Sequence, residues 1–445
     1  MNIFKLLTYN IKEHNYILYT SFQPDLCPNN FWRTILRTLK KSIGRRKIWY
    51  IIKQLWNPFH KTIKPLNKVV FAPISDNNRR SLEPIWSNLD KKDYSVVWSG
   101  DGNYMPDKLV RFWSLVFIWP LIKLYINSSK SEKLLIRTYF DEFFSTIGII
   151  VVLDKLLKHN NVKLIVMSND HCPYPRALVT VAKEYGIKTM YTQHCSVTER
   201  FPYLPFDYSF LDGMESYLKY RGVGVPLGKV YLSGNPRFDI ISKYKDTDIN
   251  NNQKIGIAIS NLDDIDIIKD LFLKLLSRGY NQLVVRPHPN TSFDPTWYLN
   301  HGIEYSDSNS ENPFEFIARM KVIIAGECGI HLDAAMMGVQ SICYNTRNAL
   351  PLDWYSYIKN GLTPYADNID RLFVLLDNNA NENLLFHEKA KWYNAMFGTK
   401  YEGLVGEMLA EFIQYELIGN VDAFDKKYGF EDIYCNEFFV KSISE

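Results

Sequence analysis

From residue 68 to residue 344, short apolar runs alternate with longer stretches in which apolar residues recur at helical spacing. The runs expected to form strands are residues 69–72, 95–98, 163–167, 189–192, 208–211, 230–233, 254–259, 282–285, 321–325 and 340–344. Helices are expected between them, among them residues 140–158, 175–185, 264–278, 313–320 and 330–337. Strands that alternate with helices predict an α/β protein with parallel sheets.

The polar run 246–253 separates two series of these elements and is expected to be a linker. At about 150 residues per domain, the 445 residues are enough for two or three domains. We therefore predict two doubly wound, Rossmann-like domains at 67–245 and 246–384 that face each other. A basic aromatic arm at 1–66 would belong to the first domain, and helices would follow at 385–445.

Composition narrows the class of protein. The net charge is only +4, so binding to nucleic acid through the charge of the whole chain is excluded. Six cysteines lie far apart with no C-x-x-C pair, which indicates a reducing cytosol.

The first twenty residues lack the apolar core of a secretory signal. The longest uncharged apolar stretch, 112–122, is much shorter than the ~20 residues that span a bilayer, so no transmembrane segment is predicted.

Positive charge is concentrated near the start of the chain. Residues 33–68 hold eleven Lys or Arg and no acidic residue, interleaved with Trp49, Trp56 and many aliphatic side chains. Such a pattern is typical of an amphipathic helix at an anionic membrane surface. The same pattern also fits a solvated basic helix that packs on the core. We expect the arm to bind an anionic membrane surface and expect no nucleic-acid partner.

Doubly wound sheets bind ligands at the carboxyl ends of their strands, so polar residues directly after each expected strand are candidates for the site. One expected strand leads into Asp170 and His171, and the next leads into His194. His194 is expected at the same rim as Asp170, and either is a candidate general base; Asp170 is alternatively a helix N-cap. The cysteine directly after each histidine does not give the ligand spacing of a zinc site, so no metal is expected.

Two basic residues follow an expected strand of the second domain. Pro287 and Pro289 alternate with Arg286 and His288 and restrict the backbone there. Held in such a turn, Arg286 and His288 suit a diphosphate, where they would offset the charge that develops on the leaving group.

A glycine-rich segment follows a later strand of the same domain. Gly326 and Gly329 allow a ligand to approach the backbone, and the helix start that follows offers N–H groups to phosphate. Glu327 would repel phosphate and is expected to accept hydrogen bonds from ribose hydroxyls. Cys328 is expected to be a small buried residue.

In this order the motifs resemble bacterial surface-polysaccharide glycosyltransferases of the GT-B fold. Within that group they are most similar to capsule and lipopolysaccharide enzymes that are distantly similar to CDP-glycerol glycerophosphotransferases. The resemblance covers residues 163–344 and rests on Asn169-Asp170-His171, Gln193-His194, Gly234-Asn235-Pro236-Arg237-Phe238-Asp239, Arg286-Pro287-His288-Pro289 and Gly326-Glu327 through Gly338. It implies a nucleotide-activated donor in the second domain, an acceptor glycan in the first and no metal requirement.

The resemblance also implies roles for single residues. His288 matches the His-Pro motif that holds the donor phosphate in GT-B sialyl- and Kdo-transferases, and His194 matches the histidine of the Gln-His segment in polyol-phosphate and capsule enzymes. Where the sialyltransferases have paired serines, this chain has Glu327-Cys328, which disfavours a CMP-sialic acid donor. Asp101, in Gly-Asp-Gly, echoes their acidic-Gly motif and is a third candidate base.

The expected function is transfer of a sugar from a nucleotide-activated donor to a lipid-linked capsule or lipopolysaccharide glycan. The chain would act without a cofactor, at the cytoplasmic face of the plasma membrane. A CDP-polyol-dependent polyol-phosphate transferase, a nucleotide-sugar epimerase and a noncatalytic scaffold of an assembly complex are the alternatives.

Overall fold

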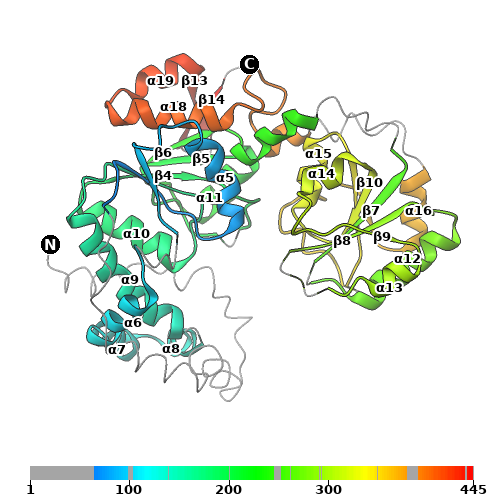
Figure 1. Ribbon diagram of the computed structural model, residues 1–445, viewed down its shortest axis with the longest axis horizontal. Helices are drawn as coiled ribbons and strands as arrows, with labels where there is room; N and C mark the ends of the chain where they lie inside the picture. Colours follow the sequence, from blue (N-terminus) through cyan, green and yellow to red (C-terminus); the bar gives the residue numbers. More distant parts are fainter. Residues whose placement is uncertain are drawn as a thin grey trace.

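The computed structural model describes residues 65–98, 104–138, 140–199, 201–244, 252–260, 262–289, 291, 293–347, 349–377, 389–435 and 438–443. Within these residues the chain forms two α/β domains, each built on its own sheet (Figure 1). The basic arm at 1–66, apart from Pro65 and Leu66, lies outside the described residues. So do Asp101 with its two glycines and most of the linker at 246–253.

The first domain contains an eight-stranded sheet of order β13-β14-β6-β5-β4-β3-β1-β2. Its strands are β1 (Val69–Phe71), β2 (Tyr94–Val96), β3 (Leu164–Met167), β4 (Lys188–Thr192), β5 (Tyr208–Leu211), β6 (Lys229–Leu232), β13 (Phe430–Cys435) and β14 (Phe438–Ile443). Neighbouring strands pair in parallel, except for the antiparallel hairpin of β13 and β14. Every residue of β3 is buried, as expected of a parallel strand with helices on both faces.

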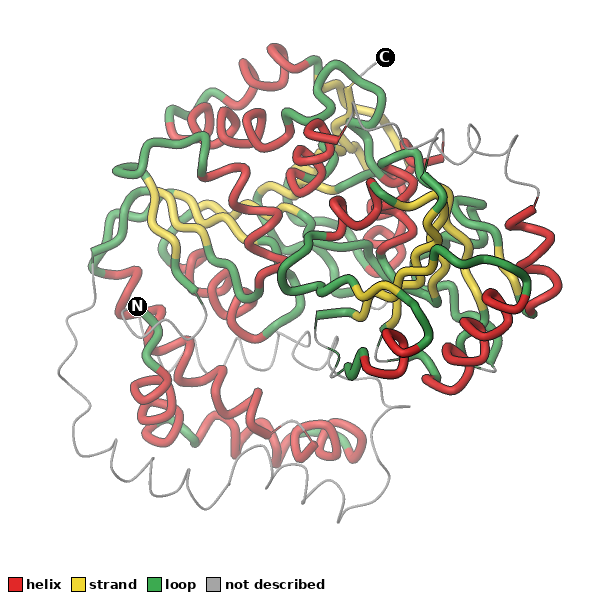
Figure 2. The backbone as a smooth tube through the Cα atoms, turned by 45° about the vertical axis from the view of Figure 1, so that its right-hand side comes forward, coloured by secondary structure: helices red, strands yellow, loops and turns green. Residues whose placement is uncertain are grey.

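Helices cover both faces of this sheet (Figure 2). The helices of this domain are α5 (Asp76–Trp86), α6 (Asp107–Val116), α7 (Trp119–Asn127), α8 (Lys130–Thr138), α9 (Phe140–Lys158), α10 (Pro173–Glu184), α11 (Met214–Val223), α18 (Val405–Leu417) and α19 (Val421–Tyr428). Helix α9 packs against α6 and α10, and α5 packs against α18. The two faces of the sheet therefore have separate hydrophobic cores, one around α9 and α10 and one around α5, α18 and α19.

The second domain contains a six-stranded, fully parallel sheet of order β12-β11-β10-β7-β8-β9. Its strands are β7 (Lys254–Ile259), β8 (Leu283–Pro287), β9 (Glu304–Tyr305), β10 (Met320–Ala325), β11 (Gln340–Tyr344) and β12 (Tyr365–Ala366). Its helices are α12 (Ile265–Ser277), α13 (Thr296–Asn300), α14 (Pro313–Ala318), α15 (Ile330–Met336) and α16 (Ile369–Asp377). The 3₁₀ helix η2 (Pro236–Tyr244) leads from the first domain toward it.

The predicted strands and helices are present, with ends that differ by a few residues. Helix α14 begins with the capping box of Asn312 and Glu315, after which Pro313 occupies the first turn. The prediction of helices alone at 385–445 is wrong, because β13 and β14 follow α18 and α19 and extend the first sheet. Among the described residues no single helix is long and apolar enough to cross a membrane. Helices α6 and α7 have that length and apolar composition only when taken together, and they are bent by 61° relative to each other.

Candidate functional site

The carboxyl edge of the first sheet meets the second domain. Beyond β4, the hydroxyl of Ser196 hydrogen-bonds that of Tyr357. Beyond β6, Arg237 forms an ion pair with Asp333 of α15 at 2.7 Å. Side chains that follow β3, β4, β5 and β6 therefore gather at the junction between the domains, where doubly wound folds bind ligands.

An aspartate–histidine pair follows β3. Nδ1 of His171 donates to Oδ1 of Asp170 at 2.7 Å, and the hydroxyl of Tyr220 donates to Oδ2 at 2.6 Å. Burial alone would raise the pKa of Asp170, but His171, Arg176 and Tyr220 together lower it below its ordinary value. Asp170 is therefore an ionised acceptor. Asp170 is 0% exposed, and its contact with Nδ1 fixes the orientation of the His171 ring; its role as a base stays a prediction.

His194 lies beside this pair, as its place after the neighbouring strand predicts. The ring centroids of His171 and His194 are 6.1 Å apart. Burial, and then the charge of His171, lowers the pKa of His194 to about 4, so its ring is neutral near pH 7. Two imidazoles thus share one edge of the sheet, and only His171 has a carboxylate partner within hydrogen-bond distance.

The cysteines at this edge are not activated. Burial raises the pKa of Cys172 to about 11 and that of Cys195 to about 12. Cys328 in the second domain has its pKa raised to about 12 by the same cause. None is a thiolate near neutral pH. Across the described ranges, no three His, Cys, Asp or Glu side chains are grouped as metal ligands.

Arg237 is a cation at this junction that its motif alone does not single out. One guanidinium nitrogen, Nη2, pairs with Asp333, while the buried Nε has no hydrogen-bond partner among the described residues. Asp212, after β5, accepts a hydrogen bond from Asn235 at 3.0 Å through Oδ1, and its Oδ2 likewise has none there. Burial raises the pKa of Asp212 to about 7, although Arg237 and Asn235 lower it.

Arg286 and His288 are placed differently from each other. Arg286 is 6% exposed, and its Nη1 and Nη2 donate to Ser306 Oγ at 2.7 Å and to the carbonyl of Glu311 at 2.8 Å. Strand β8 includes this residue, and the guanidinium holds the loop before α14; its prediction as a phosphate ligand stays a prediction. His288 lies just past the strand and is exposed. Partial burial and then the charge of Arg286 lower its pKa.

Glu327, for which a contact with ribose hydroxyls is predicted, is bound to the loop from Arg347 to Trp354. Its carboxylate pairs with Arg347 and accepts hydrogen bonds from the backbone N–H groups of Leu352 at 3.0 Å and Trp354 at 3.4 Å. This loop continues to Tyr357, which contacts the first domain. In this structure Glu327 therefore supports the junction between the domains.

The glycines before α15 differ in what they allow. A Cβ on Gly326 would lie 2.5 Å from Asp263 Oδ1 and 2.6 Å from Thr346 Oγ1, so packing inside the protein accounts for this glycine. A Cβ on Gly329 would meet nothing within 4 Å. The close approach of a ligand, predicted for both, stays a prediction.

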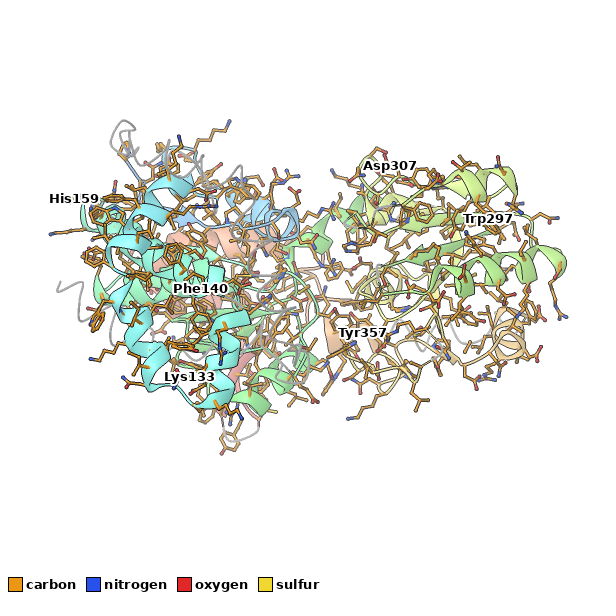
Figure 3. All side chains as sticks on the ribbon, turned by 90° about the horizontal axis from the view of Figure 1, so that it is seen from below. Lys133, Phe140, His159, Trp297, Asp307 and Tyr357 are labelled. Atoms are coloured by element: carbon orange, nitrogen blue, oxygen red, sulfur yellow. The ribbon has the colours of Figure 1, made fainter. Side chains whose placement is uncertain are left out.

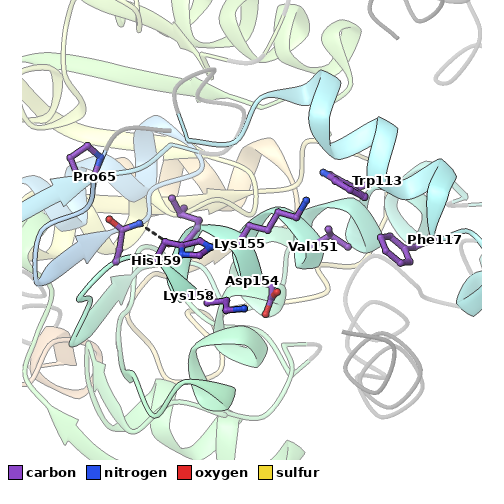
Figure 4. A pocket seen from close by; sticks show the side chains of 10 residues that line it. Pro65, Trp113, Phe117, Val151, Asp154, Lys155, Lys158 and His159 are labelled. Carbon is purple, nitrogen blue, oxygen red and sulfur yellow. Dashed lines mark hydrogen bonds between the residues drawn. The ribbon is translucent and has the colours of Figure 1, made fainter. Parts of the chain in front are cut away.

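A pocket of about 740 Å³ lies at the opposite edge of the first sheet. Figure 4 shows Trp113, Phe117 and Val151 on one side and Lys155 and His159 on another. Lys155 Nζ lies 3.5 Å from the centre of the Trp113 ring. This pocket is next to the residues that lead into the amino end of β3, so it is not part of the junction described above.

No protein-family model and no curated protein matches the sequence. Among solved structures, a protein described as a UDP-N-acetylglucosamine 2-epimerase from Listeria monocytogenes has a TM-score of 0.50 at 12% identity, covering 80% of this chain and 97% of that one. The wall teichoic acid polymerase TagF with CDPG has a TM-score of 0.48 at 13% identity, covering 87% and 97%. S. aureus MnaA with UDP has 0.49 at 13%, covering 79% and 97%. Together with the two parallel sheets, the Listeria structure confirms the predicted GT-B fold of two Rossmann-like domains.

Proposed function

We propose that this chain is a GT-B glycosyltransferase that moves a sugar from a nucleotide-activated donor to a hydroxyl of a bacterial capsule or lipopolysaccharide glycan. The observation that carries the proposal is the Asp170–His171 pair beside His194 and Arg237, at the sheet edge that meets the second domain. Transfer from a nucleotide diphosphate to a hydroxyl needs a proton acceptor and a cation, and this edge supplies both.

His171 is the proton acceptor in this proposal. Its Nδ1 is held by Asp170, so the acceptor hydroxyl gives its proton to Nε2. The buried carboxylate fixes the tautomer and stabilises the imidazolium that forms, as in other Asp–His pairs. His194, which the family resemblance favours as base, is neutral near pH 7 and is the second candidate. Single variants of the two histidines separate these assignments.

Arg237 is the donor-side cation. Its side chain is 18% exposed and lies at the start of η2, between the histidines and α15. A guanidinium whose Nε–H has no partner among the described residues suits a phosphate oxygen of the donor, where it offsets the charge on the departing diphosphate. His288 is the second proposed phosphate ligand, as the His-Pro motif implies.

Polyol-phosphate transfer from a CDP-polyol is the second candidate. Attack of a hydroxyl on phosphorus uses the same base and the same cation, so the arrangement at Asp170, His171 and Arg237 fits both reactions. A nucleotide-sugar epimerase needs no acceptor, and a scaffold needs no base. A product that forms only when an acceptor is present therefore separates the two transferases from the epimerase and the scaffold.

The test is a transfer assay with the full chain, a panel of nucleotide sugars and CDP-polyols, and lipid-linked acceptors, with products identified by mass spectrometry. His171→Ala should lower the rate about 100-fold or more while nucleotide binding, measured by calorimetry, persists. His159→Ala, at the distant pocket, is the matched control. Conversion of the donor without any acceptor, or an unchanged rate in His171→Ala, contradicts the proposal.

The proposal places the enzyme at the cytoplasmic face of the plasma membrane, where lipid-linked glycans are extended. Binding of residues 33–68 to an anionic membrane surface remains a prediction, because these residues lie almost entirely outside the described ranges. No cofactor is proposed, and the nucleotide-activated donor is a substrate.

A further inference from the structure

Large apolar side chains are exposed along α6 and α7. Leu115, Val116, Trp119, Ile122 and Ile126 are 46, 52, 66, 39 and 61% exposed, respectively. Within α7, three of them follow the spacing of a single helix face. We call these five side chains the α6–α7 face. Apolar groups gathered in this way on a protein surface mark an interaction site.

The opposite side of the same helices is fixed to the first domain. Val110, Ser114 and Leu121 are buried, and the hydroxyl of Ser114 accepts a hydrogen bond from the backbone N–H of Gly148 in α9 at 3.0 Å. A Cβ on Gly148 would lie 1.8 Å from the carbonyl oxygen of Val110, so α6 and α9 are in close contact. The α6–α7 face is therefore presented by a rigid support.

Helices α6, α7 and α8 lie on the outer side of the first domain, away from the second domain (Figures 1 and 3). The α6–α7 face is thus separate from the junction where the proposed reaction takes place. A partner that covers this face does not need to enter the junction.

Positive charge accompanies the apolar residues. Residues 104–138 contain six Lys or Arg, namely Lys108, Arg111, Lys123, Lys130, Lys133 and Arg137, and two acidic residues, Asp107 and Glu132. Glu132 accepts a hydrogen bond from the backbone N–H of Ser129 at 2.6 Å. The segment therefore has a formal charge of +4, from six positive and two negative side chains, which equals that of the whole chain. Lys123 and Lys130 are exposed, and Lys123 lies in α7 directly after Ile122 of the apolar face.

We propose that the α6–α7 face docks on a membrane that contains anionic lipid. Exposed Trp119 would lie at the level of the headgroups, Ile122 and Ile126 would reach the acyl boundary, and the lysines would contact lipid phosphate. The two helices have ten and nine residues and bend by 61°, so each covers only ~15 Å of the ~30 Å hydrocarbon core. The pair therefore lies in the interface. This inference goes beyond the proposed reaction and does not depend on it.

The test uses the full chain in flotation assays with vesicles of phosphatidylcholine, with and without phosphatidylglycerol. The double variant Trp119→Ser/Ile126→Ser should bind anionic vesicles about tenfold more weakly than the unaltered chain. Leu227→Ser/Ile418→Ser is the matched control, because these residues are 61 and 73% exposed outside the α6–α7 face. Lys123→Glu/Lys130→Glu should remove the preference for anionic over neutral vesicles.

Hydrogen exchange locates the contact without relying on variants. Anionic vesicles should slow exchange in peptides from 107–127. Equal binding of the Trp119→Ser/Ile126→Ser chain and the unaltered chain, or protection confined to 33–68, overturns the proposal in favour of the basic arm. A lipid-free dimer that the same variant dissociates also overturns it, because a second copy would then cover the face.

Discussion

Replacement of Asp170 by Asn tests the Asp–His pair most directly. The two side chains have nearly the same shape, and the amide oxygen still accepts from Tyr220, which donates at 2.6 Å in the native protein. The amide nitrogen then faces Nδ1 of His171 and donates to it. The ring proton moves to Nε2, so the atom that should accept the proton of the substrate hydroxyl is already protonated. The expected loss in transfer rate is ~10³ to 10⁴-fold, the size of effect that a wrong tautomer produces.

The pH dependence of stability checks the charge of Asp170. Its pKa is lowered in the folded protein, so its carboxylate stabilises the fold above the ordinary pKa of ~4 and loses that effect as the pH falls through the folded value. The Asn variant should lack this contribution and should be destabilised by about 1–3 kcal/mol at neutral pH. Chemical unfolding at several pH values measures it.

The assays are initial transfer rates and ¹⁵N NMR of the His171 ring, which distinguishes the two tautomers without a substrate. Tyr220→Phe is the control, since it removes the hydrogen bonds of this hydroxyl to Asp170 and Tyr191 and leaves the bond of Asp170 to His171; it should cost about 1–3 kcal/mol of stability and at most ~10-fold in rate. If Asp170→Asn retains the native tautomer, or transfers within threefold of the native rate, the reasoning fails.

Three further predictions concern two residues of the junction between the domains and His331, a buried residue of α15 whose ring centroid lies 6.3 Å from that of Tyr357. Arg237→Met should weaken binding of the nucleotide donor about 10- to 100-fold by calorimetry, whereas Arg278→Met, an exposed control, should not. Asp212→Asn should stabilise the protein by a few kcal/mol at pH 7, because a carboxyl with a pKa of about 7 in the fold is a cost once the unfolded chain ionises near pH 4. That cost grows between about pH 4 and pH 7, so urea unfolding should show a clearly larger gain at pH 8 than at pH 5, and an equal gain at both would contradict the assignment. Burial lowers the pKa of His331 to about 4, so stability should fall by up to roughly 3 kcal/mol between pH 6.5 and pH 4. His331→Gln should flatten that part of the profile, and an unchanged slope would contradict the assignment.

Strand order could be anticipated only where strands that follow each other in sequence also lie side by side. Because β3 and β4 are neighbours, His171 and His194 meet as the strand positions predict. The hairpin of β13 and β14 was missed because Glu431, Asp432 and Lys441 interrupt its apolar pattern. Those charges are tolerated because five of the six residues of β13 are at least partly exposed at the edge of the sheet.

Side-chain direction at the site could not be predicted from position along the chain. Arg286 was expected in a turn, but strand pairing with β7 extends as far as Pro287 and brings its guanidinium to Ser306. Tyr220 contacts Asp170 from a helix fifty positions later in the chain, and no local pattern connects them. Arg237 stood in a recognised motif, yet its partner Asp333 comes from the other domain. Contacts of this range are set by tertiary packing.

Arg286 and Glu327 share a property that sequence reasoning does not detect. Both lie where a ligand was expected, and each is held by residues of its own domain. A charged residue after a strand serves a ligand only when the protein itself leaves its polar atoms available. That condition depends on loops such as the one from Arg347 to Trp354, which have little periodic pattern.

The return of the chain to the first sheet has a consequence for biosynthesis. Strand β14 pairs with β6, and α18 packs on α5, so the last part of the chain completes a domain that begins before residue 70. The second domain, at 254–377, lies between these two parts and has local contacts of its own. On the ribosome the inserted domain should therefore fold first, while the first domain waits for its final strands. During that interval the edge of β6 and the apolar surface of α5 are without their partners and are exposed to non-native pairing and aggregation.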